Sequence, residues 1–228
     1  MQPIQLAINE PFAAPPAGAN WVIFSDSHSY TDEEDTPRML SRAIRYARKF
    51  GVYLIPGKFL QNGCICMCVI SPTGEPVLGQ EAIFLNLSHR GELARGDRPG
   101  VADTPFGRVA LCVDVDINHP EYIKAVVGLG AQVVFSSRFL EIFDAVENRI
   151  RTPVVSAALS SGVYMVSVTN AGSCIVGPDG RMILSVRDSL SMTATLPADE
   201  LQSDLRRIEA GRRLIDTYFA GRGEVQHV

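Results

Sequence analysis

The stretch from residue 107 to residue 137 constrains the fold more than any other part of the chain. It reads GRVALCVDVDINHPEYIKAVVGLGAQVVFSS: an apolar run, a short polar connection, a helical segment opened by Pro120, and a second apolar run. Two buried strands joined through a helix are parallel, and such crossovers are almost always right-handed. The chain is therefore predicted to be an α/β protein with a parallel sheet.

Other short apolar runs predict the remaining strands. Two of them fold back on a turn rich in proline and glycine, once early and once late in the chain, which indicates two similar halves, each a sheet with helices on its outer side. The predicted strand segments are residues 4–9, 20–26, 52–57, 64–80, 163–170 and 172–186.

Residues 36–51 carry the clearest helical pattern. Pro37 suits the first turn and Gly51 suits the C-terminal cap. The apolar stripe of this helix is predicted to contain Leu40, Ile44 and Ala47.

Two further helices are predicted in the second half. Residues 143–162 form a helix that we expect to break near Pro153. A C-terminal helical tail, from about residue 198, is amphipathic and can pack on the core or on a second subunit. Between the first two strands, residues 10–19 contain too much proline for a full helix.

Composition bounds the class of protein. A chain of 228 residues with 46% hydrophobic and 20% charged residues fits one soluble domain, residues 1–228. Its net charge of -4, with no basic patch, argues against nucleic acid as a partner. Without a membrane-length apolar run or a secretory signal, we expect no membrane segment and a cytoplasmic location.

Three of the five cysteines alternate along one predicted strand, at positions 64, 66 and 68. Their side chains should point to one face. Metal ligation is one interpretation, but there is no second ligand pair nearby, and cysteine is a common small core residue. We favour a buried face over a metal site.

The ordered set of segments resembles the nitrilase superfamily of carbon-nitrogen hydrolases. The similarity is carried by NWVIFSD, VISPTGEPVLG, DTPFGRVALCVDVDINHPE, GAQVVFSS, GVYMVSVTNAG and IVGPDGRMILSV. The resemblance implies a four-layer α-β-β-α sandwich, here with the first outer helix shortened or missing, and commonly a dimer. It also implies hydrolysis or transfer at amide, nitrile or carbamoyl groups by a glutamate base, an oxyanion-binding lysine and a cysteine nucleophile.

Matched to this pattern, the chain departs from the family at its catalytic positions. The spacing from Gly107 to Glu121 is kept without a gap, which places Asp114 at the nucleophile position. The lysine position falls on Ile83 and the glutamate position on Asp26. Glu92 matches a second glutamate.

Two aspartates in a pocket without that lysine would repel each other unless a cation matched them. Arg138, which follows a strand end that borders the pocket in the family, is the first choice of partner, and Lys58 is the second. Ser137 and His119 complete the predicted pocket.

Three functions remain open. The chain is a binding or scaffold protein that lacks the thiol chemistry and acts through a homo-oligomer, a small molecule or a partner protein; this is the main hypothesis, and it needs no cofactor. Alternatively, Asp26, Asp114 and Asp116, with His28 or His119, support carboxylate or metal-assisted hydrolysis. In the third, Cys112 is recruited as the nucleophile.

Overall fold

Strands that are mostly buried on both faces build two sheets that pack face to face. The computed structural model describes residues 3–25, 30–86, 91–140, 146–186 and 191–197. Within them, one sheet has seven strands in the order β13-β1-β2-β3-β5-β4, with β6 paired to the other edge of β5. Its strands are β1 (Ile4–Asn9), β2 (Trp21–Phe24), β3 (Tyr53–Ile55), β4 (Phe59–Gln61), β5 (Cys64–Ile70), β6 (Pro76–Glu81) and β13 (Ser191–Leu196).

The second sheet of the described chain has six strands in the order β12-β11-β10-β9-β8-β7. The predicted strand-helix-strand unit lies at its centre, because β8 and β9 are parallel and α2 connects them. Its elements are β7 (Val101–Thr104), β8 (Gly107–Val113), β9 (Val133–Arg138), β10 (Tyr164–Thr169), β11 (Gly172–Val176) and β12 (Met182–Val186), with η2 (Asp114–Asn118, a 3-10 helix) and α2 (Pro120–Gly128) between β8 and β9.

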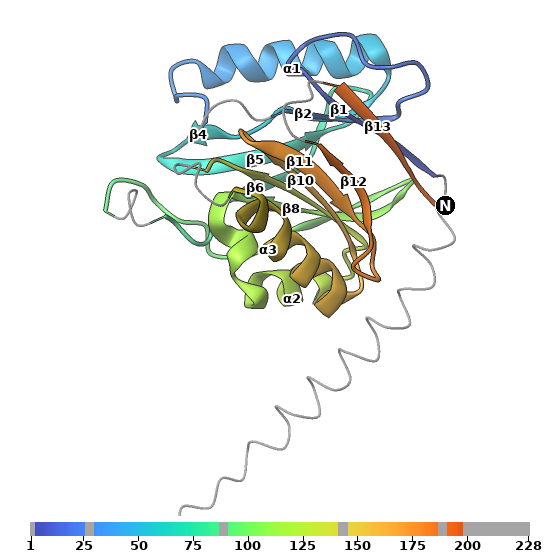
Figure 1. Cartoon of the computed structure of the whole chain (residues 1–228). Coiled ribbons are helices and arrows are strands. Elements are labelled where there is room, and N and C mark those ends of the chain that lie inside the picture. Colours follow the sequence, from blue (N-terminus) through green and yellow to red (C-terminus); the bar gives the residue numbers. More distant parts are fainter. Residues whose placement is uncertain (1–2, 26–29, 87–90, 141–145, 187–190, 198–228) are drawn as a thin grey trace, which may run out of the picture.

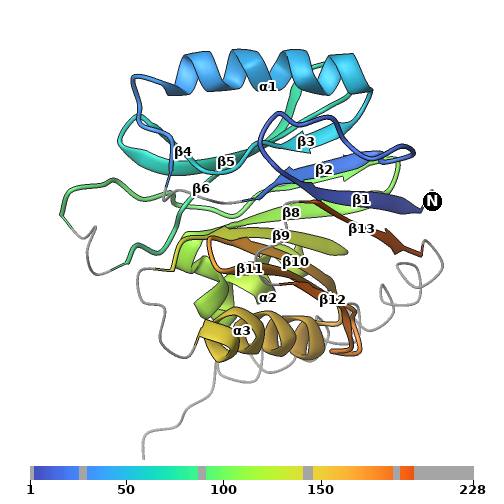
Figure 2. The same cartoon turned by 45° about the horizontal axis from the view of Figure 1, so that its top comes forward.

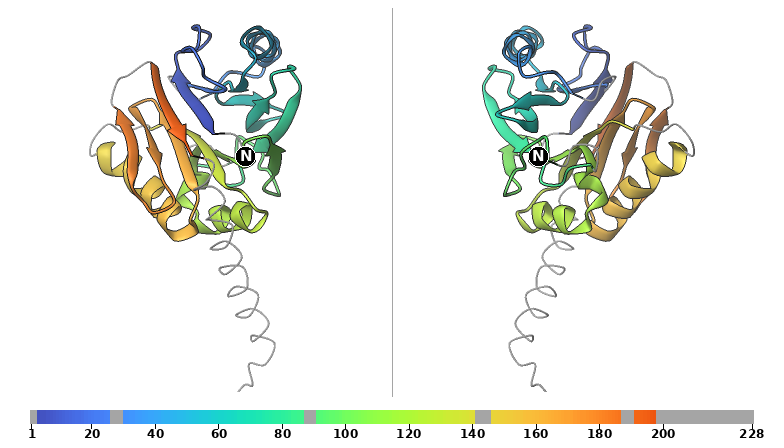
Figure 3. Two further views of the ribbon diagram at one scale, coloured as in Figure 1. Left: turned by 90° about the vertical axis from the view of Figure 1, so that its right-hand side faces the viewer. Right: turned by 90° about the vertical axis from the view of Figure 1, so that its left-hand side faces the viewer.

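The layers follow the order helix, sheet, sheet, helix, as predicted. α1 (Thr36–Phe50) covers the seven-stranded sheet, and α2 and α3 (Val146–Ser161) cover the six-stranded one (Figures 1 and 2). A buried apolar cluster fills each interface, and the central one joins the two sheets. There Trp21 stacks between Tyr53 and Phe135, with ring centroids 4.8 and 4.9 Å away. Figure 3 shows the two sheets side-on.

No helix separates β1 from β2, so the prediction that the first outer helix is shortened or missing is confirmed. The connection does not leave the sheet bare, however. Phe12 turns inward at a φ of 64° and packs edge-on against Phe24 and Tyr46. Arg42 of α1 lies over the ring of Phe12, with its guanidinium carbon 3.8 Å from the centroid. A short connection therefore replaces part of the cover that a helix would give.

The first helix has its predicted cap, and its predicted apolar stripe packs on the sheet. Gly51 ends α1 in the left-handed conformation, with its N–H bonded to the carbonyl of Ala47. The residues of α1 that are fully buried are Thr36, Ala43, Tyr46 and Ala47, whereas Leu40 and Ile44 are half-buried. The apolar stripe is thus wider than the surface that α1 presses onto the sheet.

The prediction that the helix near Pro153 breaks is wrong. α3 runs through Pro153 as one helix. Proline removes one backbone N–H but does not end a helix whose inward side is otherwise well packed. Val154, Ala157 and Ala158 bury that side.

Three strands were not predicted: β4, β7 and β13. Each is short or half-exposed, so its sequence lacks a continuous apolar run. The predicted C-terminal helical tail lies outside the described residues. Among the described residues, no helix has the length and apolar character that crossing a membrane requires.

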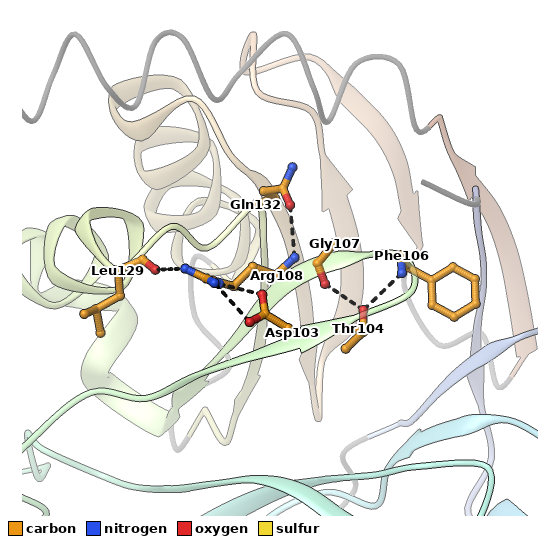
Figure 4. A network of polar contacts seen from close by, with 7 residues as sticks. All are labelled: Asp103, Thr104, Phe106, Gly107, Arg108, Leu129 and Gln132. Atoms are coloured by element: carbon orange, nitrogen blue, oxygen red, sulfur yellow. Dashed lines mark hydrogen bonds and ion pairs between the residues drawn. The ribbon is translucent and has the colours of Figure 1, made fainter.

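At the N-terminal ends of β8 and β9, a polar network fixes the β7-β8 hairpin (Figure 4). Arg108 forms two hydrogen bonds with the carboxylate of Asp103, at 2.8 and 3.0 Å, and a third with the carbonyl of Leu129. The buried side chain of Gln132 accepts the backbone N–H of Arg108 at 3.0 Å. These contacts set the register at the end of the sheet opposite to the predicted pocket.

Candidate functional site

The carboxyl ends of three parallel strands meet at one edge of the six-stranded sheet. Val113 of β8 is level with Ser137 of β9, and Arg138 is level with Thr169 of β10. Ligands of open α/β sheets collect at such edges. The predicted pocket residues that follow these strands are thereby brought together.

Asp114 begins the turn that leaves β8. Its φ is 49°, a left-handed conformation that is uncommon outside glycine and that aspartate and asparagine tolerate best. The strand passes directly into η2 at this residue. A sharp strand-to-helix turn of this kind presents a side chain at the top of a sheet and is the geometry of a nucleophile elbow. We call this turn at Asp114 the elbow, and its side chain is a carboxylate. That it matches the nucleophile position of the family stays a prediction.

Lys58 reaches this carboxylate from the other sheet. It lies between β3 and β4, and its Nζ is 3.2 Å from Oδ1 of Asp114. The side chains are 1% and 10% exposed, so the ion pair is shielded from water. Of the two predicted partners, the second choice makes this contact.

The same oxygen of Asp114 accepts a backbone N–H. Phe139 donates to Oδ1 at 3.2 Å. The backbone after β9 is held in place by Asn170, whose amide accepts the N–H of Leu140 at 2.8 Å and donates to its carbonyl at 3.0 Å. Asn170 thus positions the segment whose N–H reaches the elbow carboxylate.

Asp116, two residues further along, faces the backbone after β6. Its Oδ1 accepts the N–H of Phe84 at 2.7 Å and that of Ile83 at 3.2 Å. Burial raises the pKa of this carboxyl to about 7, while these backbone hydrogen bonds act in the opposite direction. Asp116 therefore fastens the segment with the lysine position to the elbow.

Ile83, which the sequence predicts at the lysine position, has no side-chain group that could donate to an oxyanion. Ile83 packs against the apolar cluster between the six-stranded sheet and its helices, together with Phe84. His119 stacks on Phe84 with ring centroids 3.6 Å apart and an angle of 6°, and its Nδ1 is 3.4 Å from a carboxylate oxygen of Glu121. The predicted pocket histidine thus lies at the start of α2.

Arg138 and Ser137 are both buried at the end of β9. Nη2 of Arg138 donates to the carbonyl of Ile150 at 3.4 Å. Burial lowers the pKa of the guanidinium, and the nearby Cys112, Cys174 and Asp114 act in the opposite direction. The guanidinium of Arg138 therefore places a positive charge near Asp114 and Cys112.

Cys112 points into the helix-side apolar cluster and is fully buried. Burial raises the pKa of its thiol well above the ordinary value, and Asp116 adds to the effect. A neutral thiol in an apolar interior is a poor nucleophile. All five cysteines are buried and free of disulfides.

Of the remaining predicted residues, the structure describes Glu92. Glu92 is exposed in a turn. Asp26, at the glutamate position, and His28 lie outside the described residues. Within the part of the chain that the structure describes, no three histidine, cysteine, aspartate or glutamate side chains cluster as metal ligands.

The sequence pattern did not predict that Asp116 and Asn170 would hold other segments of the chain in position. Both hold backbone segments from other parts of the chain, 32 and 30 residues away. Their position after buried strands was the available signal, since polar residues there often bond to neighbouring loops.

A scan against models of protein families gave no match, and neither did a search of curated proteins. Solved structures do match. Nit3 of Saccharomyces cerevisiae, a member of branch 10 of the nitrilase superfamily, aligns at a TM-score of 0.73 and 15% identity, over 89% of this chain and 93% of that one. An amidase from Nesterenkonia sp. aligns at 0.73 and 19% identity, over 92% and 96%.

A carbon-nitrogen hydrolase from Helicobacter pylori G27 aligns at a TM-score of 0.77 and 14% identity, over 90% of this chain and 93% of that one. These likenesses confirm the predicted similarity to nitrilase-superfamily structures and the nitrilase-type fold.

Proposed function

We propose that this chain uses the nitrilase-type fold for binding or scaffolding and does not perform cysteine-dependent hydrolysis. The observation that carries the proposal is the buried ion pair between Asp114 and Lys58 at the elbow. In the similar amidase from Nesterenkonia sp., a structure carries a covalent acetamide group at the active site cysteine. Here the elbow offers a carboxylate that is already engaged.

A carboxylate at this position is poorly suited to attack an amide. Its product would be an anhydride, which needs strong electrophilic help to form. Ile83 supplies no such help from its side chain, and the ammonium of Lys58 is bound to Asp114 itself. Loss of one oxyanion donor alone typically lowers the rate by about 10²–10³-fold.

The direct test is release of ammonia by the purified full chain. Acetamide, butyramide and a short aliphatic nitrile are incubated with the protein, and the Nesterenkonia amidase is assayed beside it as the active control. We expect ammonia at the rate of the protein-free blank. Protein-dependent release that is lost on alkylation of thiols would overturn the proposal in favour of a recruited cysteine.

A second candidate is hydrolysis by carboxylate chemistry. It is favoured by Asp116, whose raised pKa of about 7 lets it hold a proton near neutrality, two residues from Asp114. Turnover that survives thiol alkylation and is abolished in Asp114→Asn is the result expected from this chemistry. Metal-assisted hydrolysis would in addition be abolished by chelation and restored by a divalent cation.

A homodimer and a cytoplasmic location belong to the same proposal. A dimer has about twice the chain mass of 24.8 kDa, which light scattering after gel filtration measures directly. A mass equal to one chain at micromolar concentration would contradict the dimer.

A further inference from the structure

A groove of about 680 Å³ lies on the outer side of the seven-stranded sheet, away from the elbow. One wall is formed by Leu40 and Ile44, two of the apolar residues of α1 that the sheet does not bury completely. The floor is formed by β5 and β6, of which β6 lies at the edge of the sheet. We call this hollow the β5–β6 groove.

Two thiols of β5 and a glycine of β6 lie in the floor of the β5–β6 groove. Cys66 and Cys68 point to this face, and their partners on β6 are Glu81 and Gly79. Burial raises the pKa of both thiols to about 12, so they are neutral and act as apolar surface. A Cβ added to Gly79 would meet no atom within 4 Å, so the space above this glycine is open.

The second wall of the groove contains Arg98 and Gly100, and the buried side chain of Gln80 holds it in place. Gln80 accepts the N–H of Gly100 at 2.8 Å and donates to the carbonyls of Glu81 and Arg98, at 2.8 and 3.2 Å. Gly96 packs so closely on Glu81 that a Cβ there would be 2.8 Å from the Cβ of Glu81. The groove therefore has two fixed walls.

Among the described residues that line the groove, the one charge that no neighbour offsets is negative. Asp97 and Arg98 pair with each other at 3.1 Å and offset one another. Glu81 is exposed, and no basic side chain among the described residues forms an ion pair with it. Glu81 is directly opposite Cys66 in the β5-β6 ladder, so its side chain lies on the same face as this thiol.

We propose that the β5–β6 groove binds a small organic cation with an apolar body, such as an alkyl or aryl amine. Its volume lies in the range of small-molecule sites, which combine an apolar lining with a few polar groups that fix orientation. The apolar body would rest on the thiols, Leu40 and Ile44, and the ammonium would face Glu81. The groove is separate from the elbow, so the inference does not depend on the proposed function.

The experiment is calorimetric titration of the full chain with octylammonium, octanoate and 1-octanol at pH 7.5. An alkylamine is protonated at this pH because amines of this type have a pKa of about 10.4. We expect saturable binding of one octylammonium with a dissociation constant below about 1 mM, and at least about tenfold weaker binding of octanoate, which Glu81 repels. Absence of saturable octylammonium binding, or equal binding of octanoate, overturns the proposal.

Two variants and a matched control locate the site. Gly79→Leu fills the open space above the floor and should abolish binding, whereas Gly128→Leu, at a glycine of α2 that also has nothing within 4 Å, should leave binding unchanged. Glu81→Gln should remove the preference for octylammonium over 1-octanol.

Undiminished binding by Gly79→Leu with native circular dichroism would place the ligand elsewhere and refute the site. A dimer of the wild-type chain that dissociates in Gly79→Leu would show that a second copy occupies the groove, and would refute the amine.

Discussion

Replacing Lys58 by methionine is expected to lower the free energy of unfolding by about 3 kcal/mol. Methionine keeps much of the length of the lysine stem but leaves the carboxylate of Asp114 buried without its ammonium. Breaking a buried ion pair by removing one partner typically costs about 3–5 kcal/mol. We expect the lower end, because Asp114 is 10% exposed and keeps the hydrogen bond from Phe139.

A double-mutant cycle separates the ion pair from other effects of the substitution. Asp114→Asn removes the charge and keeps the left-handed backbone, which asparagine tolerates. In the double variant neither charge is left alone in the interior. The combined loss should therefore be smaller than the sum of the single losses by at least about 1.5 kcal/mol.

Urea unfolding provides the measurement. Trp21 is the single tryptophan of the chain and is buried between Tyr53 and Phe135, so its fluorescence reports the core between the sheets. Single losses that add to within about 0.5 kcal/mol would refute the coupling of Lys58 and Asp114.

Three further predictions concern titration, a buried hydrogen bond and the thiols. The pKa of Asp116 is about 7 in the folded chain and exceeds its ordinary value of 3.8, so the free energy of unfolding should fall as the pH rises from about 4 to about 7. Asp116→Asn should remove this loss of up to about 4 kcal/mol. If the variant and the wild-type chain show the same pH profile of the urea midpoint, the prediction is contradicted. Gln132→Met should lower the free energy of unfolding by about 1–3 kcal/mol, because the backbone N–H of Arg108 loses its buried acceptor. Arg108→Met breaks a largely exposed ion pair and should lower it by about 1 kcal/mol. A larger loss for Arg108→Met than for Gln132→Met in thermal unfolding would count against this reasoning. With thiol pKa values of about 12, Cys66 and Cys68 should react with iodoacetamide about a thousandfold more slowly in the folded chain than in urea. If mass spectrometry finds both thiols modified as fast in the folded chain as in urea, their burial is disproved.

Local pattern was enough to predict the centre of the fold. The strand-helix-strand unit of residues 107–137 was recognisable because a continuous apolar run, a proline at a helix start and a second run all lie within one short stretch. The elbow could be placed at Asp114 for the same reason, since its spacing to Glu121 is local. The position of Asp114 in the left-handed turn agrees with that placement.

Features that depend on distant pairing were out of reach. β13 has an alternating, partly polar sequence and owes its place to pairing with β1. Arg138 was preferred as the partner because the corresponding strand end borders the pocket in the family. The contact of Lys58 with Asp114 comes from the facing sheet, and the sequence does not show how close the sheets approach at that point. The prediction of a break near Pro153 was wrong because it rested on local helix propensity, whereas packing of α3 on the sheet keeps the helix continuous.

The pairing of β13 with β1 has a consequence for how the molecule assembles. Ile4 is matched with Leu196, so one side of β1 has no neighbour until a segment about 190 residues further along the chain has been made. An unmatched strand side invites pairing with other chains. Truncation before β13, or a pause in translation there, should therefore leave this side of β1 open to aggregation, even though every residue around the elbow has already been synthesised.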